Sequence, residues 1–486
     1  MTEQNHQNGS FKEVIKSMNY NVKLTFAFYT SSSIGRGIWM GNVLSLFIIL
    51  LMGDDLFLGF GGNEILGLTS AASGITMTLF VFPAGYLADK FRRDIILKSA
   101  TSLGLAALVF VSLVGSNFLT FELNIIFIFI SMLLWGFFNA LVRPSLEAIF
   151  ADSVESGYRS KIYSWGHMIQ QFSMALGPFL NIALFYIFGN EWTVKIMRSV
   201  MFVGLVISLA SIIILFFFRD EKSLGEVSEA IRDEVTEVVV EASAKSRVLN
   251  LTSEKAAKMI PFLLVASNVI IGIGAGMTIK FFPVFFKEIY VLNPVAIQVI
   301  MGFTSLLTGI LGIIAQKFSL KQGRVQMIYW VQFIATACLV VLAIYPPLWV
   351  LVPIFIARGS FMNAAQPLSR SILMDIIPKK NRGRWNSVEA IAWGLFWNMS
   401  AVIGGFLVGD NNNFNLCFTI TAFVYILGMI PIIIMMPMVG KEREALEKDN
   451  LLEEAVILNE DKDEPLEEVF SLSTLNPEKD SLESLE

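Results

Sequence analysis

Twelve long apolar runs, separated by short polar loops, constrain this chain more than any other feature of its sequence. They cover roughly residues 24–52, 64–88, 95–116, 123–151, 162–188, 195–218, 259–286, 295–315, 325–345, 347–376, 387–408 and 414–438. A run of about 18 or more apolar residues is typical of a transmembrane helix, whereas a barrel strand has about ten residues and alternates. Since lipid offers the backbone no hydrogen-bond partners, the sequence predicts an all-α membrane protein with twelve transmembrane helices.

The composition agrees with a membrane protein and argues against several other classes. Only 16% of the residues are charged, against about 25% in soluble domains. The net charge of −5 comes largely from the ends and loops, so we expect no nucleic-acid partner. Cys338 and Cys417 lie inside apolar runs and are interpreted as packing residues. The sequence shows no metal-ligand cluster, phosphate loop or nucleophile–base arrangement, so we expect no enzyme activity, no metal and no cofactor.

Lysine and arginine gather in the loops that follow the even-numbered runs. These loops contain Lys90, Arg92, Arg93, Arg159, Lys161, Lys317, Lys321, Arg324, Lys379, Lys380, Arg382 and Arg384. The loops after the odd-numbered runs are nearly free of cations, with Lys195 and Lys287 as exceptions. Because cytoplasmic loops carry the excess of positive charge, we expect the even-run loops and both termini to be cytoplasmic.

The second half of the chain repeats the first. NALVRPSLEAIFADSVESGYRSKIYS (139–164) resembles MNAAQPLSRSILMDIIPKKNRGRWNS (362–387), and GRG at 35–37 corresponds to GAG at 274–276. We therefore expect two duplicated six-helix bundles around a central cavity, an arrangement frequent in transporters. The predicted parts are a cytoplasmic N-terminal segment (1–23), the first bundle (24–218), a cytoplasmic linker (219–257), the second bundle (258–438) and an acidic cytoplasmic tail (439–486).

The loop between the second and third runs carries the most specific motif. GYLADKFRRDIIL (85–97) resembles the loop signature of the major facilitator superfamily, a family of membrane transporters, although Arg92 stands where that family prefers Gly. The matching positions are Gly85, Leu87, Asp89, Lys90, Arg93 and Leu97. The resemblance implies that Asp89 and Arg93 latch the cytoplasmic ends of the two halves together. A carboxylate at that boundary can bind cations and the N-terminus of a neighbouring helix.

The signatures of one branch of that family are degenerate in this chain. MALGP (174–178) resembles the Gly-Pro bend in the fifth span of proton-coupled exporters, but Ser164 and Ser173 replace its earlier glycines. Met132 stands where many such exporters carry an arginine. These departures weaken the interpretation as a drug/proton antiporter, which stays open as an alternative.

Polar side chains inside the spans are the candidates for substrate binding, because a charge in the bilayer is costly unless it is paired or hydrated. The resemblance implies that the first, fourth, seventh and tenth spans line the cavity. The candidates on these spans are Arg36, Asn139, Arg143, Lys280, Arg358, Asn363 and Gln366. The arginines outnumber the carboxylates, of which Glu147 is the clear one, and arginine binds carboxylates and phosphates through two parallel bonds. We therefore expect a small organic anion or an amphipathic molecule with an acidic head.

A second set of charged residues is expected to gate the cavity. Besides Asp89 and Arg93, this set comprises Glu147, Asp152, Arg159, Arg370, Asp375 and Arg382. Glu147 and Arg370 occupy equivalent positions in the two halves, so we hypothesise that they pair across the interface when the cytoplasmic side closes. The alternative is a local pair between Glu147 and Arg143, four residues apart on one helix. Glu147 and His167 are the candidates for proton coupling, although a packing role is the simpler interpretation of His167.

These features favour a secondary transporter that moves a small-molecule substrate by alternating access. A channel-like facilitator and a transporter-like receptor or scaffold, with the acidic tail as its working part, stay open as alternatives. We expect a monomer embedded in the lipid bilayer of the plasma membrane or of an endolysosomal-type membrane. The second location is suggested by EKDNLL (447–452), which resembles an endolysosomal sorting signal.

Overall fold

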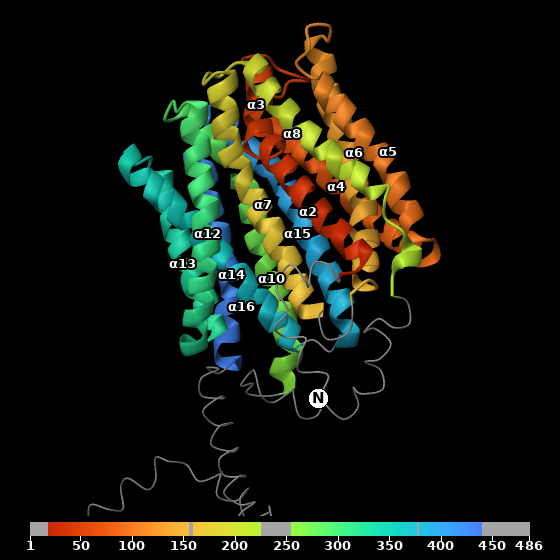
Figure 1. Cartoon of the computed structure of the whole chain (residues 1–486). Helices are drawn as coiled ribbons and strands as arrows, with labels where there is room; N and C mark the ends of the chain where they lie inside the picture. Colours follow the sequence, from red (N-terminus) through yellow and green to blue (C-terminus); the bar gives the residue numbers. More distant parts are fainter. Residues whose placement is uncertain (1–17, 155–158, 225–253, 377–378, 440–486) are drawn as a thin grey trace, which may run out of the picture.

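The structure, a computed structural model, describes residues 18–154, 159–224, 254–376 and 379–439, and helices make up nearly all of it (Figure 1). The first half contains α2 (Tyr20–Trp39), α3 (Asn42–Met52), α4 (Gly62–Lys90), α5 (Arg93–Leu113), α6 (Phe121–Ala151), α7 (Arg159–Phe188), α8 (Val194–Leu215) and the 3₁₀ helix η2 (Asp220–Lys222). The second half contains α10 (Glu254–Ile279), α11 (Phe282–Glu288), α12 (Pro294–Gln322), α13 (Arg324–Ala343), α14 (Leu348–Ile376), α15 (Lys379–Val408), α16 (Phe414–Met435) and η4 (Met436–Met438). Most of the predicted N-terminal segment, linker and tail lies outside the described residues.

The helices are long and apolar enough to cross a bilayer. Among the described residues, eleven stretches meet this condition, the first of them formed by α2 and α3 together. The twelfth is α15, whose apolar part is Gly394–Val408. The β pairing in this part of the chain is limited to an isolated bridge between Phe57 and Phe60. The prediction of an all-α membrane protein with twelve transmembrane helices is confirmed.

The first and seventh spans are each broken into two helices, which the apolar pattern did not predict. The helix stops at Met40–Gly41 in the first span and at Lys280–Phe281 in the seventh. In the seventh span Pro283 stands in the first turn of α11, where a missing N–H is tolerated at a helix start but would interrupt a continuing helix. In the first span Gly41 leaves the helical conformation, with ψ at −116°. The breaks occur at equivalent places in the two halves.

The duplicated glycine pairs make equivalent contacts in the two halves. The first glycine of GRG (35–37) packs on α8 and the second packs on α7. The first glycine of GAG (274–276) packs on α16 and the second packs on α15. A Cβ on Gly37 would lie 3.1 Å from the Cα of Gly177, so these helices approach each other backbone to backbone, as small residues allow in membranes. The repeated motif thus holds the first helix of each half against the last two.

The two halves meet along two pairs of helices (Figure 1). α4 packs against α15, and α7 packs against α12. Within the halves, α2 packs on α7 and α8, and α10 packs on α15 and α16. These matching contacts confirm two similar six-helix bundles.

Hydrogen bonds join the halves at one end of the molecule, which we call the sealed end. It comprises the loops 53–61, 189–193, 289–293 and 409–413. The Asn63 amide donates to the Gly409 carbonyl (2.9 Å) and to Asn412 Oδ1 (3.1 Å). The Trp192 indole N–H donates to the Leu292 carbonyl (2.8 Å). Each of these bonds crosses from the first half to the second.

Glycines show that the helices touch near the sealed end and separate at the opposite end, which we call the open end. A Cβ added to Gly67 of α4 or to Gly405 of α15 would lie 2.5 Å from a carbonyl oxygen of the other helix. A Cβ added near the open end, to Gly85 of α4 or Gly309 of α12, would meet no atom within 4 Å. The loops after the even-numbered spans lie at the open end, where α2 also begins and α16 ends.

Candidate functional site

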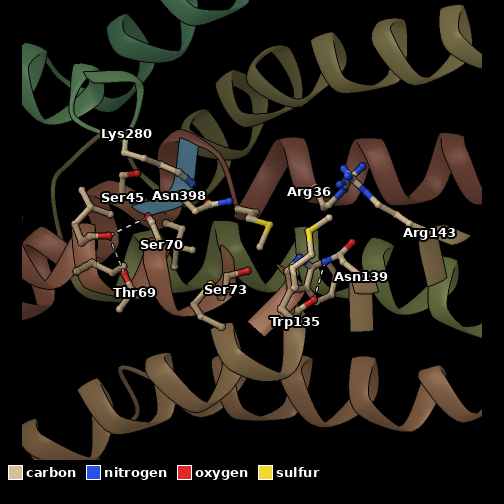
Figure 2. Close-up of a pocket in the computed structure, with 16 residues that line it drawn as sticks. Arg36, Ser45, Thr69, Ser70, Ser73, Trp135, Asn139, Arg143, Lys280 and Asn398 are labelled. Carbon is tan, nitrogen blue, oxygen red and sulfur yellow. Dashed lines mark hydrogen bonds between the residues drawn. The ribbon is translucent and has the colours of Figure 1, made fainter. Parts of the chain in front are cut away.

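A cavity of about 170 Å³ lies where the two halves face each other (Figure 2). Its walls come mainly from α2, α3, α4 and α6, and the second half contributes Lys280, at the break between α10 and α11, and Asn398 of α15. The polar side chains that line it are Arg36, Ser45, Thr69, Ser70, Ser73, Asn139, Arg143, Lys280 and Asn398. Three of these are cations, and the described lining contains no carboxylate.

Arg36 and Arg143 bring two guanidinium groups together at one end of the cavity (Figure 2). Arg36 projects from α2, and its Nε donates to the Ser32 carbonyl (3.3 Å). Arg143 projects from α6 and forms no hydrogen bond or ion pair with a described side chain. The two groups act on each other electrostatically, and like charges repel each other. An anion between them would relieve this repulsion.

Lys280 supplies the positive charge at the other end of the cavity. Figure 2 places it with Ser45 and Asn398, with Thr69 and Ser70 nearby. The hydroxyls of Thr69 and Ser70 both donate to one carbonyl of the preceding turn of α4, each at 3.0 Å. Within the described part of the chain, no carboxylate lies within ion-pair distance of the Lys280 ammonium. This end therefore also presents an uncompensated charge.

Apolar side chains also line the cavity. They are Met40, Leu44, Ile48, Leu66, Met77, Met132 and Trp135. Ser73 is the hydroxyl nearest the middle of the cavity (Figure 2). The Asn139 amide N–H donates a hydrogen bond to the Trp135 carbonyl of its own helix (2.7 Å). The cavity thus combines two positive ends with a lining of polar and apolar side chains.

Four predicted residues lie nearer the open end and do not line this cavity. Asn363, Gln366 and Arg370 on α14 and Glu147 on α6 are all exposed. Arg143 acts electrostatically on Glu147 more strongly than Arg370 does, and neither forms an ion pair with it within 4.0 Å in the described residues. The hypothesis that Glu147 and Arg370 pair when the open end closes therefore stays a prediction, as does the local pair.

Arg358 lies away from the candidate ligand contacts, in the core of the second half. It is only 4% exposed. Its Nη2 donates to the Tyr425 hydroxyl (2.8 Å), and its guanidinium carbon lies 4.7 Å from the Phe282 ring centre. A guanidinium is stabilised over an aromatic face, so these partners hold the side chain between α14, α16 and α11. The structure places Arg358 outside the cavity for which it was a candidate.

The charged loop before α5 is held by its own half of the molecule. Arg93 forms an ion pair with Asp152, and its backbone N–H donates to Asp220 Oδ2 (3.1 Å). Arg92 pairs with Glu221 (2.8 Å). Hydrogen bonds to Asp94 and then to Glu221 raise the pKa of Arg92 above its usual value. In this arrangement the segment after α8 binds the loop through Asp220 and Glu221. The predicted latch between the two halves through Arg93 stays a prediction.

The remaining gating candidates can be placed only in part. The side chains of Asp89, Arg159, Asp375 and Arg382 lie outside the described residues. His167 is exposed on α7 and does not line the cavity, although Arg370 acts on it electrostatically. Its role in proton coupling stays a prediction.

Two similar six-helix halves in a membrane, with a charged cavity between them, are typical of membrane transporters. The sequence pattern of the Major Facilitator Superfamily matches residues 25–359 and 264–475. The chain belongs to this family, which confirms the resemblance seen in the loop motif.

Solved structures of other transporters have a similar fold. The crystal structure of a bacterial homologue of the iron transporter ferroportin in its inward-facing state has a TM-score of 0.63 at 14% identity, covering 88% of this chain and 99% of that one. Its outward-facing state has a TM-score of 0.55 at 14% identity, covering 85% and 99%. In sequence, 219 residues are 26% identical to a Na(+), Li(+), K(+)/H(+) antiporter of Planococcus maritimus. That match spans 44% of this chain and 46% of the relative, less than half of either.

The apolar pattern missed several lining residues. Ser45, Ser70 and Asn398 lie in apolar spans and were not predicted to contribute. Asn398 had a visible signal, because an amide in an otherwise apolar eleventh span is unusual. Ser45 and Ser70 had none, since a serine inside a transmembrane helix commonly bonds its own backbone.

Proposed function

We propose that this chain carries a small organic anion across the membrane by alternating access. The observation that supports this most is the charge of the cavity, where Arg36, Arg143 and Lys280 meet no lining carboxylate. Charges inside a membrane are costly unless they are neutralised or hydrated, so an anionic substrate is the natural partner. Arginine suits carboxylates and phosphates because it binds them through two parallel hydrogen bonds.

The proposal also states which side of the membrane the open end faces. The loops after the even-numbered spans carry most of the loop cations, so the open end is the cytoplasmic end under the positive-inside rule. The arrangement is then inward-facing, with the sealed end outside. The higher TM-score to the inward-facing than to the outward-facing ferroportin homologue, 0.63 against 0.55, supports this assignment.

A cation/proton antiporter is the second candidate. It is favoured by the partial match to the Na(+), Li(+), K(+)/H(+) antiporter and by Glu147, an exposed carboxylate on α6. The cavity argues against it, because three positive charges repel a cation and hard cations prefer carboxylate and carbonyl oxygens.

Thermal unfolding of the purified protein with a ligand panel separates the two candidates. The panel contains carboxylates, sulfonates and phosphate esters on one side, and Na⁺, Li⁺, K⁺ and tetraphenylphosphonium on the other. A ligand that binds only the folded state raises the unfolding temperature. We expect a response to anions that Arg36→Gln removes and that the control Arg219→Gln keeps, since Arg219 is exposed and lies outside the cavity.

Transport itself is then measured in liposomes with the anion that gives the largest shift. Counterflow of labelled anion into preloaded vesicles is expected of a carrier and not of a channel or a receptor. A response to cations alone, or equal anion responses of Arg36→Gln and Arg219→Gln, would show that the anion proposal is wrong.

A further inference from the structure

The cations of the cavity fall into two groups at opposite ends. Figure 2 shows the guanidinium groups of Arg36 and Arg143 at one end and Lys280 at the other, beside Ser45. Arg36 and Ser45 are nine residues apart on the first span. Arg36 lies on α2 and Ser45 on α3, on either side of the break at Met40–Gly41. A ligand with one acidic group at each end matches this arrangement.

The two ends differ in what they offer a ligand. The arginine end presents two planar guanidinium groups, each able to bind an acidic group through two parallel bonds. The lysine end presents one compact ammonium among the Ser45 hydroxyl and the Asn398 amide. An acidic group is therefore favoured at each end, and the arginine end is expected to bind it more strongly.

The space between the ends is small and has both polar and apolar lining residues. A cavity of about 170 Å³ is of a size that suits a small organic acid. Met77 and Met132 are among the apolar lining residues. Methionine adapts its shape to neighbouring apolar groups, and a short carbon chain is the complement of such a wall.

We infer that the cavity binds an elongated dianion, with one acidic group at each end and a short apolar segment between them. The inference rests on the proposed function and goes further by naming the class of substrate. Arg36 and Arg143 hold one acidic group, and Lys280 holds the other. A monoanion of the same length leaves the Lys280 charge without a partner, and a desolvated charge without a partner is costly.

A paired series of acids tests this inference on the purified full-length protein. The dissociation constants of succinate, glutarate, adipate and pimelate are compared with those of butyrate, valerate, hexanoate and heptanoate by isothermal titration. At the best chain length we expect the diacid to bind about tenfold tighter or more than its monoacid partner. Diacids that are too short or too long are expected to bind more weakly.

Variants assign the two acidic groups to the two ends. Lys280→Met is expected to weaken the diacid to the level of the monoacid while leaving the monoacid unchanged, and Lys280→Arg is expected to keep the difference. Arg36→Gln should weaken both acids. Lys195→Met is the control, because Lys195 is exposed outside the cavity. The unfolding temperature of each variant shows that it is folded.

The outcomes separate this inference from the proposal on which it rests. If monoacids bind as tightly as diacids at every length, or if Lys280→Met and Lys195→Met behave alike, the dianion is refuted while anion transport stands. If neither series binds and only cations do, both are refuted.

Discussion

Replacing one glycine at the sealed end should shift the protein from the arrangement in the structure, which is inward-facing under the proposed orientation, to the outward-facing one. A Cβ on Gly405 would lie 2.5 Å from the Asn63 carbonyl oxygen on the opposite half. Real Cβ atoms essentially never come closer than 3.0 Å to such an atom. Gly405→Ala therefore requires α15 to move away from α4 by about 0.5 Å or more, and close-packed interiors resist such shifts.

The expected change in the equilibrium between the two arrangements depends on which arrangement contains the clash. Overpacking of this kind costs about 1–3 kcal/mol. The clash is present only while the halves touch at the sealed end, so the whole cost falls on the inward-facing arrangement. The equilibrium between the two arrangements is then expected to change by about 5- to 150-fold in favour of the outward-facing one.

Cysteine labelling from outside measures this shift. Cys338 and Cys417 are replaced by alanine, and Ser73→Cys places one thiol in the cavity. A membrane-impermeant maleimide added to the outer side is expected to label it faster in Gly405→Ala than in the parent. Gly309→Ala on α12 is the matched control, because its added Cβ meets no atom within 4 Å and it lies outside the loop motif.

The reasoning is refuted by one particular combination of results. If Gly405→Ala and Gly309→Ala are labelled at the same rate while Gly405→Ala alone unfolds at a lower temperature, the clash destabilises the fold as a whole. The contact between α4 and α15 would then not be one that opens during transport.

Three further predictions concern charged residues. Tyr425→Phe removes the hydroxyl that accepts a hydrogen bond from the buried Arg358. We expect the free energy of unfolding, measured by denaturant titration, to fall by about 1.5–3 kcal/mol. The response to anions should stay unchanged. Glu147→Arg and Arg370→Glu are each expected to impair transport and together to restore part of it; a double variant no better than the worse single one would favour the local pair within α6. Asp89→Asn is expected to keep membrane insertion but slow turnover by favouring the inward-facing arrangement, and full turnover with unchanged labelling of the cavity would contradict the latch.

The sequence predicted the helices well because their signal is strong and local. Each span must be long and apolar to cross the bilayer, so its approximate limits can be read without knowing its neighbours. The break at Lys280–Phe281 was missed because it leaves the apolar pattern intact. Pro283 is compatible both with a kinked helix and with a new helix start, and the packing around it decides which occurs.

The cavity was predicted less completely because it depends on packing between distant segments. Arg36, Asn139, Arg143 and Lys280 were identified, since polar groups in spans are few and need a reason. Arg358 met the same criterion but lies over Phe282 and bonds to Tyr425. Nothing in its own span distinguishes a guanidinium held by aromatic rings from one that faces a cavity.

Under the proposed function, the three cations of the cavity would also couple the empty protein to the membrane voltage. The proposed alternating access places the same charges at the inner potential in one arrangement and at the outer potential in the other. With the interior about 100 mV negative, the inward-facing arrangement is favoured by up to about 2.3 kcal/mol for each charge. A bound dianion cancels two of the three charges of Arg36, Arg143 and Lys280, so the loaded protein feels the voltage much less. The membrane potential would hold the empty carrier facing the cytoplasm, and the arrival of substrate would release it.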